Sequence, residues 1–294
     1  MFGVSLVVFT MMYFTPGDPA RIMLGESAPA EAVEDLREEL GLNDHFVIQY
    51  GNWLKDLIFN GDIGSSYRTR RPVSDEIIDR FPTTLRLAAA GVAVSVVVGV
   101  PIGIISATKQ YSFLDNASMF TALLGVSMPN FWLAMLLIIQ FSVNWDLLPS
   151  SGLDSPISYI LPAITLGTSS AATIARMTRS SMLEVIRQDY IRTARAKGQV
   201  ESVITNRHAL KNALIPIITV IGLQFGALLG GAVLTESVFS IPGVGRLMVD
   251  SIGARDFPVV QGGVLFIAIA FSLINLLVDI LYAFVDPRIK SQYK

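Results

Sequence analysis

The sequence has 294 residues, of which 52% are hydrophobic and only 16% are charged, and its mean hydropathy is positive at +0.54. This composition excludes an ordinary soluble domain, in which about a quarter of the residues carry charge. The net charge of −2 offers no overall basic field to nucleic acid, and the lack of cysteine together with only 2 histidines leaves no expected metal site.

Six charge-free runs are long enough, or nearly so, to cross a membrane as helices. About 20 helical residues are needed to span about 30 Å of hydrocarbon. The runs cover 1–17, 87–108, 116–145, 155–175, 212–235 and 257–278. They lack the alternating pattern, repeated over about ten residues, that a transmembrane β-strand shows. The sequence therefore predicts an all-α integral membrane protein with six transmembrane helices in a lipid bilayer.

The first run is the weakest of the six. It opens at Met1 without a preceding Lys or Arg, so a cleaved signal sequence is one alternative, although no basic n-region and no small-residue cleavage site is visible. We interpret residues 1–17 as the first transmembrane helix, and a natural start that is missing from the sequence is the remaining alternative.

A long polar segment, residues 18–82, follows the first run and is expected outside the membrane. Apolar residues at helical spacing between Pro29 and Gly41 predict a short acidic helix. Residues 46–59 predict a second helix with one aromatic and aliphatic side. This second helix either packs against the membrane bundle or forms a lid or docking surface for an external partner.

Basic residues set the expected orientation, because short cytoplasmic loops are enriched in Lys and Arg. Segment 176–211 carries eight basic residues and three acidic ones, so it is expected in the cytoplasm. Six crossings then place the turn at Lys109 and a tail at 286–294 on the same side. We therefore expect both termini inside, with residues 83–285 forming a core of five transmembrane helices.

Segment 176–211 is too long for a simple connection between two helices, and this length predicts a folded cytoplasmic element. Apolar residues recur three and four apart on both sides of Gly198, which predicts two short helices meeting at this glycine. Such an elbow either docks into a soluble partner and transmits its movement, or lies as a basic hairpin on anionic lipid. The pattern alone leaves both interpretations open.

Glycines four residues apart occur in two of the predicted spans. Gly99 and Gly103 lie in the second span, and Gly222, Gly226 and Gly230 lie in the fifth. This spacing favours close helix packing, with lining of a pathway as the alternative. Prolines within or beside the spans are candidate kinks: Pro101, Pro129, Pro162 and Pro216.

Two acidic residues at the ends of spans are further candidates for a pathway or a gate. Glu236 follows the fifth span at its outer end, where it faces either a positively charged ligand terminus or a partner subunit. Asp279 lies near the inner end of the sixth span, and an intramembrane carboxylate is a functional candidate by default. Pairing with Arg288 or Lys290 of the tail is the alternative.

Residues 189–198, DYIRTARAKG, and 208–216, HALKNALIP, closely resemble the EAA loop of ABC importer permeases in the dipeptide, oligopeptide and nickel branch. Other stretches familiar from this family lie at 16–19, 61–66, 81–85, 236–245, 256–262 and 286–288, so the resemblance covers essentially the whole chain. The named Glu-Ala-Ala triplet is here Arg192-Thr193-Ala194, and the closing proline lies farther from Gly198 than in sugar-transporting relatives. These departures favour the peptide and nickel branch.

The resemblance implies the type I ABC importer fold and one half of a translocation pathway in a bacterial cytoplasmic membrane. It implies four kinds of partner: a second homologous permease, two cytoplasmic ATPases, an external substrate-binding protein and lipid. The chain lacks the phosphate-binding motif GxxxxGK[ST], so ATP and Mg are expected on the ATPases, with no cofactor and no catalytic residue here.

The expected cargo is a dipeptide or oligopeptide, with nickel or another small solute as the alternative. An ion-coupled secondary carrier is less favoured, because the paired mid-membrane charges that it needs are missing from the sequence. A membrane enzyme is disfavoured too, since no motif such as H-E-x-x-H occurs.

The same resemblance assigns the region 195–205 to the coupling helix, with Gly198 as its turn. The candidate residues for coupling to the ATPase are Arg192, Thr193, Ala194, Arg195, Ala196, Lys197, Gly198, Val200, Glu201, Ile204 and Arg207. The candidate residues for the pathway or its gate are Gly222, Gly226, Gly230, Glu236 and Asp279.

Overall fold

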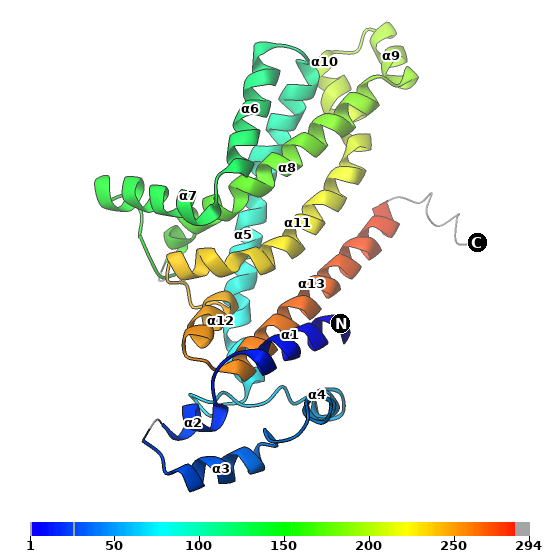
Figure 1. The fold of residues 1–294 in the computed structure, drawn as a ribbon. Coiled ribbons are helices and arrows are strands. Elements are labelled where there is room, and N and C mark those ends of the chain that lie inside the picture. The colour runs from blue at the N-terminus through cyan, green and yellow to red at the C-terminus, as the bar shows by residue number, and fades with distance from the viewer. Residues whose placement is uncertain (1, 26, 154, 286–294) are drawn as a thin grey trace, which may run out of the picture. The chain divides into compact units, whose positions relative to one another are not determined.

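The computed structural model describes residues 2–25, 27–153 and 155–285, with side chains as far as Ile280. Within these ranges the chain is helical, and its β pairing is limited to an isolated bridge between Ser65 and Pro72 (Figure 1). The predicted all-α class is confirmed. The predicted tail, with Arg288, Lys290 and the motif at 286–288, lies outside the described residues.

The chain divides into two compact units, Met1–Thr84 with Pro242–Ala270, and Leu85–Ile241 with Phe271–Lys294. The division predicted from sequence, at residues 17, 82 and 285, follows expected membrane crossings rather than compactness. It stays a prediction about topology.

The first unit contains the polar segment 18–82, of which residue 26 is not described, and parts of two long helices. Its elements are α1 (Phe2–Phe14), α2 (Pro19–Leu24), α3 (Ala30–Glu39), α4 (Phe46–Lys55), the π-helix η1 (Asp56–Asn60), the start of α5 (Val73–Thr108), α12 (Val244–Gly253) and the start of α13 (Phe257–Val285). The two short helices predicted within segment 18–82 are confirmed as α3 and α4.

Helix α4 packs against α1 through aromatic rings. The Phe9 ring centroid lies 5.2 Å from that of Tyr50 and 5.8 Å from that of Trp53. The hydroxyls of Ser5 and Tyr50 are hydrogen bonded at 2.9 Å. Edge-to-face contacts of this kind stabilise helix pairs beyond their buried area. The aromatic side of this helix thus packs against α1, while a role as a lid or docking surface stays a prediction.

Three sequence motifs meet around Asp256, the residue before α13. Its carboxylate accepts hydrogen bonds from the Ser66 hydroxyl and, at 2.9 Å, from the Tyr67 amide. Gly17 lies against Arg255 and Phe257, where a Cβ would approach both side chains within 3.5 Å. Burial raises the pKa of Tyr67 to about 12, and the charge of Asp256 adds to this effect. Residues Ser66 and Tyr67 are thus joined to the α12–α13 turn by hydrogen bonds.

The second unit contains the remaining helices and is organised around α8. Its elements are the rest of α5, α6 (Phe113–Ser127), α7 (Asn130–Leu137), the π-helix η2 (Ile138–Asn144), the 3₁₀ turn η3 (Pro156–Tyr159), α8 (Ile160–Ile186), α9 (Asp189–Ala196), α10 (Glu201–Val203), the π-helix η4 (Ile204–Ala209), α11 (Leu210–Val238) and the rest of α13. Helix α8 packs along both α6 and α11 (Figure 1).

Four described helical segments have the length and composition of a membrane span: Val73–Thr108, Pro156–Ile186, Glu201–Val238 and Phe257–Ile280. Helices α6 and α7–η2 together qualify as a fifth, although the two halves are bent by 101°. Helix α1 has 13 residues and is shorter than a full span. The predicted fold class is confirmed. Of the six predicted spans, four are single long helices, one is a bent pair of helices, and the first is a short helix.

The span predicted over 116–145 is not one continuous helix, because it is broken at Pro129, one of the candidate kinks. Proline disfavours helical geometry in the residue before it, and Met128 accordingly adopts an extended conformation with ψ 127°. Pro129 then stands at the N-terminal cap of α7. One of the four candidate kinks is thus a complete break.

Helices α5 and α8 extend beyond the predicted spans 87–108 and 155–175. Helix α5 begins at Val73, and α8 continues to Ile186. Hydrocarbon excludes charged residues, but a helix does not. A charge-free run therefore marks only the apolar part of a helix and underestimates the length of the helix. The connection after the fourth span is consequently shorter than the predicted segment 176–211.

The glycine pairs are sites of close helix packing. A Cβ on Gly103 would lie 2.6 Å from the carbonyl oxygen of Ala175, and one on Gly222 would lie 2.3 Å from Val278. Gly226 similarly faces Phe271. Gly230 is different, because a Cβ there would meet no atom within 4 Å.

We expect Gly222→Ala to destabilise the folded protein by about 1–3 kcal/mol, because the added methyl group overlaps Val278 in a packed interface. Gly230→Ala, in the same helix, is the matched control. It should be neutral or stabilising by up to about 1 kcal/mol, since alanine is the better helix former. Thermal unfolding of both variants in the same detergent measures the difference, and equal stabilities would contradict the packing assignment.

Candidate functional site: an anchored elbow between α8 and α11

The candidate site is the elbow, which we define as residues 187–209 between α8 and α11. It contains α9, the turn at Gly198, α10 and η4. The predicted meeting of two helical pieces at Gly198 is confirmed. The first piece differs from the prediction, because α8 ends at Ile186 and the extended residue Gln188 precedes α9.

Gly198 ends α9 in a Schellman motif. Its φ is +77°, its amide donates to the Arg195 carbonyl at 2.9 Å, and the Gln199 amide donates to the Ala194 carbonyl at 3.3 Å. Only glycine adopts this left-handed geometry without strain. A Cβ at this position would meet no other atom within 4 Å, so the requirement for glycine lies in the backbone and not in crowding within the chain.

An ion pair closes the turn across Gly198. The guanidinium of Arg195 donates from Nε to one oxygen of Glu201 at 2.7 Å and from a terminal nitrogen to the other at 3.2 Å. This bidentate hydrogen bond and the charge of Glu201 raise the pKa of Arg195 above its ordinary value. Both side chains are solvent-exposed, so the pair orients the turn more than it stabilises the protein.

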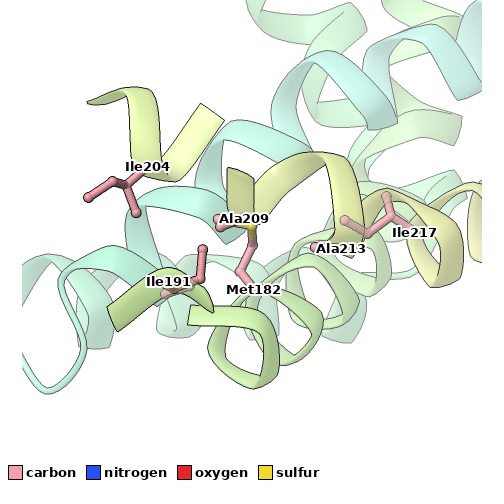
Figure 2. Close-up of a cluster of buried hydrophobic side chains, with 7 residues drawn as sticks. Met182, Ile191, Ile204, Ala209, Ala213 and Ile217 are labelled. Carbon is pink, nitrogen blue, oxygen red and sulfur yellow. The ribbon is translucent and has the colours of Figure 1, made fainter. Parts of the chain in front are cut away.

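Buried hydrophobic side chains anchor the elbow to the helices on both sides of it. Ile191 of α9 and Ile204 of η4 are fully buried and pack with Met182 of α8 and with Ala213 and Ile217 of α11 (Figure 2). Such contacts exclude independent movement of α9, since separating them would expose apolar surface to water. The elbow is therefore packed onto both α8 and α11.

Most of the predicted coupling residues lie on the exposed side of the elbow. Exposed are Arg192, Thr193, Arg195, Ala196, Lys197, Gly198, Val200, Glu201 and Arg207, whereas Ala194 is half-buried. Ile204 is an exception, because it is completely buried in the anchoring cluster and presents no surface to a partner. Its place in the helical pattern fits this anchoring role.

The exposed side also carries apolar surface. Val200, one of the predicted coupling residues, is 68% exposed, and Tyr190 and Val203, which the prediction did not include, are exposed as well. The Tyr190 hydroxyl accepts a hydrogen bond from Asn212 of α11 at 3.0 Å, which fixes the ring. Exposed apolar residues next to basic ones are a signal for protein docking that the sequence contained.

The candidate pathway residues are not brought together in one place. Gly222 and Gly226 pack against α13. The Glu236 side chain is completely buried, and the Glu236 carbonyl accepts a hydrogen bond from the Ile241 amide at 2.8 Å. This conformation does not present Glu236 to a ligand. Gly230 faces open space, and Asp279 is exposed near the end of α13. Their roles in a pathway stay predictions.

A buried ion pair between α6 and α8 was missed by the sequence reasoning. The two oxygens of Asp115 accept hydrogen bonds from Nε and a terminal nitrogen of Arg179, each at 2.9 Å. The Ser106 hydroxyl and the Tyr111 amide also donate to this carboxylate. Asp115 is only 2% exposed. We call this group the Asp115–Arg179 clamp, and it joins the α5–α6 turn to α8.

The described part of the chain contains no group of three or more His, Asp or Glu side chains placed to hold a metal ion. The exposed side of the elbow consists of basic, acidic and apolar side chains on a helical bundle. Comparison with known proteins supplies the family of the chain.

Two family descriptions match the chain almost end to end. Residues 99–291 match the binding-protein-dependent transport system inner membrane component, and residues 1–88 match the N-terminal part of such membrane components. The chain belongs to this family. The resemblance to ABC importer permeases is therefore confirmed, and the chain is a membrane permease component rather than the catalytic subunit of its transport system.

Individual relatives agree with this assignment. The permease is 47% identical to the dipeptide transport system permease protein DppB of Alkalihalophilus pseudofirmus, over 99% of this chain and 95% of the relative. It is 46% identical to the glutathione transport system permease protein GsiC of Escherichia coli K12, over 99% and 94%. A putative peptide transport system permease protein of Brucella abortus is 47% identical, over 99% and 95%.

Among solved structures, the permease is similar to a chain of the inward-facing MetNI methionine ABC transporter. The TM-score is 0.61 at 21% identity, covering 71% of this chain and 96% of that one. At this identity the similarity shows the fold, and the predicted type I ABC importer architecture is confirmed.

Proposed function

We propose that the permease forms half of the translocation pathway of an ATP-driven importer for dipeptides and oligopeptides. Relatives that share nearly half of its residues over almost the whole chain are named for dipeptide, glutathione and peptide transport. Glutathione is itself a short peptide, so all three names indicate the same class of cargo.

The elbow is the proposed docking surface for a cytoplasmic ATPase. The observation that carries this proposal is its anchoring: Ile191 and Ile204 fix the elbow to both α8 and α11. A push on the exposed side is therefore transmitted to two helices at once. The exposed valine at position 200 favours a protein groove over a lipid surface, because it lies among charges of both signs.

The complete transporter would contain a second homologous permease, two ATPases that bind ATP and Mg, and an external substrate-binding protein. In this proposal the elbow and both chain termini face the cytoplasm, and the segment with α2, α3 and α4 lies outside. The membrane is the bacterial cytoplasmic membrane.

Reconstitution of the co-purified transporter into liposomes tests the proposal. We expect ATP-dependent uptake of the dipeptide Leu-Leu in the presence of its binding protein, and no uptake when the ATPases are omitted. Uptake of Ni²⁺ in place of peptide would favour the nickel alternative. Uptake driven by an ion gradient without ATP would contradict the proposal as a whole.

A further inference from the structure

A hollow of about 580 Å³ lies between α6 and α8, within the second unit. The two helices pack side by side near the α5–α6 turn (Figure 1). Met119 of α6 lines one wall of the hollow. The C-terminal half of α8 and the residue after it supply three arginines, two further polar residues and one leucine: Arg176, Arg179, Arg187, Ser180, Glu184 and Leu183. The hollow is thus a basic pocket with an apolar side.

The pocket lies at the boundary between hydrocarbon and water that the sequence predicts for both helices. The charge-free run of α6 begins at residue 116, and that of α8 ends at residue 175. Met119 is therefore just inside the hydrocarbon, and Arg176 is the first residue beyond it. Tyr111 of the nearby α5–α6 turn is exposed, and tyrosine is enriched where the membrane meets water. The pocket is thus at the level of the phospholipid headgroups.

Two of the three arginines have charge available for a ligand. Arg179 is already paired with Asp115 in the clamp. Neither Arg176 nor Arg187 has a carboxylate within ion-pair distance among the described residues. Of the residues that line the pocket, Glu184 alone carries a carboxylate without such a pair. Two available positive charges therefore face one negative charge, and this excess favours an anionic ligand.

Apolar surface continues from the pocket along α6 toward the middle of the membrane. The next turns of this helix expose three large apolar side chains, Phe120, Leu123 and Leu124. Exposed apolar surface of this kind marks contact with lipid or with another protein. A ligand in the pocket thus meets positive charge at one end and apolar surface at the other. This order of charge and apolar surface matches the headgroup and the acyl chains of a phospholipid.

We propose that the pocket binds the headgroup of an anionic phospholipid, with its phosphate between Arg176 and Ser180. These two residues are four positions apart and share one face of α8, so a guanidinium and a hydroxyl donate to the same phosphate. Glu184 lies one turn farther along and accepts a hydrogen bond from a hydroxyl of a glycerol headgroup. The acyl chains lie along the exposed side of α6. Basic pockets between membrane helices on the cytoplasmic side are a recurrent form of anionic lipid site.

Native mass spectrometry of the complete transporter, stripped of lipid in detergent, tests the site. Phosphatidylglycerol and phosphatidylcholine with identical acyl chains are added at equal concentrations. We expect the native transporter to retain phosphatidylglycerol at least about fivefold more strongly, because one arginine near an anionic lipid contributes about this factor. Equal retention of the two lipids overturns the inference.

Three variants locate the preference on the pocket. Arg176→Gln should weaken the retention of phosphatidylglycerol about fivefold, and Arg176→Lys should keep part of it because the charge is kept. Arg176 is exposed, so neither change disturbs the packing of α8. Arg86→Gln is the matched control, since it removes the same charge from an exposed residue of α5 that does not line the pocket. An equal loss in Arg176→Gln and Arg86→Gln would assign the preference to net charge and overturn the site.

Other ligands and a covered pocket give different results. Stronger retention of phosphatidylethanolamine than of phosphatidylglycerol would indicate an ammonium group at Glu184 and overturn the anionic assignment. A pocket covered by the second permease would show no lipid preference in the complete transporter. Only the assignment to the cytoplasmic leaflet rests on the proposed function. A native transporter that takes up no Leu-Leu contradicts that function, whereas its lipid retention still tests the pocket.

Discussion

In the complete transporter, Gly198→Val should lower peptide-stimulated ATP hydrolysis and ATP-driven peptide uptake about tenfold or more, while the permease still inserts and assembles. The reason is the backbone of the turn. A β-branched residue does not adopt the left-handed conformation that Gly198 has at φ +77°, so the Schellman motif opens and the Arg195–Glu201 pair loses its geometry. The anchoring cluster of Ile191 and Ile204 lies away from the turn and should keep the elbow folded.

Gly198→Asn is the matched control for this prediction. Asparagine tolerates the left-handed conformation, and a side chain at this position meets no atom of the chain within 4 Å. It should therefore retain much more coupling than valine. Coupling is measured as peptide transported per ATP hydrolysed in liposomes. Equal activities of the valine variant and the native permease would contradict a role of the elbow in coupling, and equal losses in both variants would place the cause in surface contact rather than in backbone geometry.

Breaking the Asp115–Arg179 clamp by Asp115→Leu should destabilise the permease by about 1–3 kcal/mol, because Arg179, the Ser106 hydroxyl and the Tyr111 amide then lose their acceptor. The side chain of Asp115 is 3% exposed but that of Arg179 is 27% exposed, so water solvates part of the arginine and the loss is smaller than for a fully buried ion pair. The free energy of unfolding in mild detergent, titrated with denaturant, measures the effect. We expect the loss to appear as a smaller yield of folded protein as well.

A double variant and a surface pair serve as controls for the clamp. Asp115→Leu combined with Arg179→Met should recover much of the lost stability, since both charges are then removed. Arg71→Ala breaks a pair with Asp79 at 2.9 Å in which both side chains are more than half exposed. It should cost at most about 1 kcal/mol. A single Asp115 variant as stable as the native protein would show that the clamp has no structural role.

The elbow shows which features depend on local sequence and which depend on helix packing. The interruption at Gly198 predicted two helical pieces, and the motifs around it identified the family of the chain. Both predictions were possible because they depend only on the order of neighbouring residues. The burial of Ile204 did not follow, since it depends on α8, α9 and α11 packing together. A helical pattern marks one apolar side, but it does not say whether that side faces a core or a partner.

The predicted membrane spans differ from the observed helices because polarity alone does not fix backbone conformation. Charge-free runs located the apolar parts of five long stretches correctly, because hydrocarbon excludes charge whatever the fold. They missed the break at Pro129 and the extension of α8 to Ile186, since helical geometry is decided by backbone conformation and not by polarity.

By itself, the sequence determined that this chain is an all-α membrane protein of the importer permease family, because composition, apolar runs and motif order are properties of the chain alone. Only the tertiary structure decided which glycines pack helices together, how Asp115 and Arg179 pair across 64 positions, and that Ile204 of the elbow is buried. The physical reason is that burial and pairing are relations between helices, and residues distant in sequence acquire them only when the helices pack.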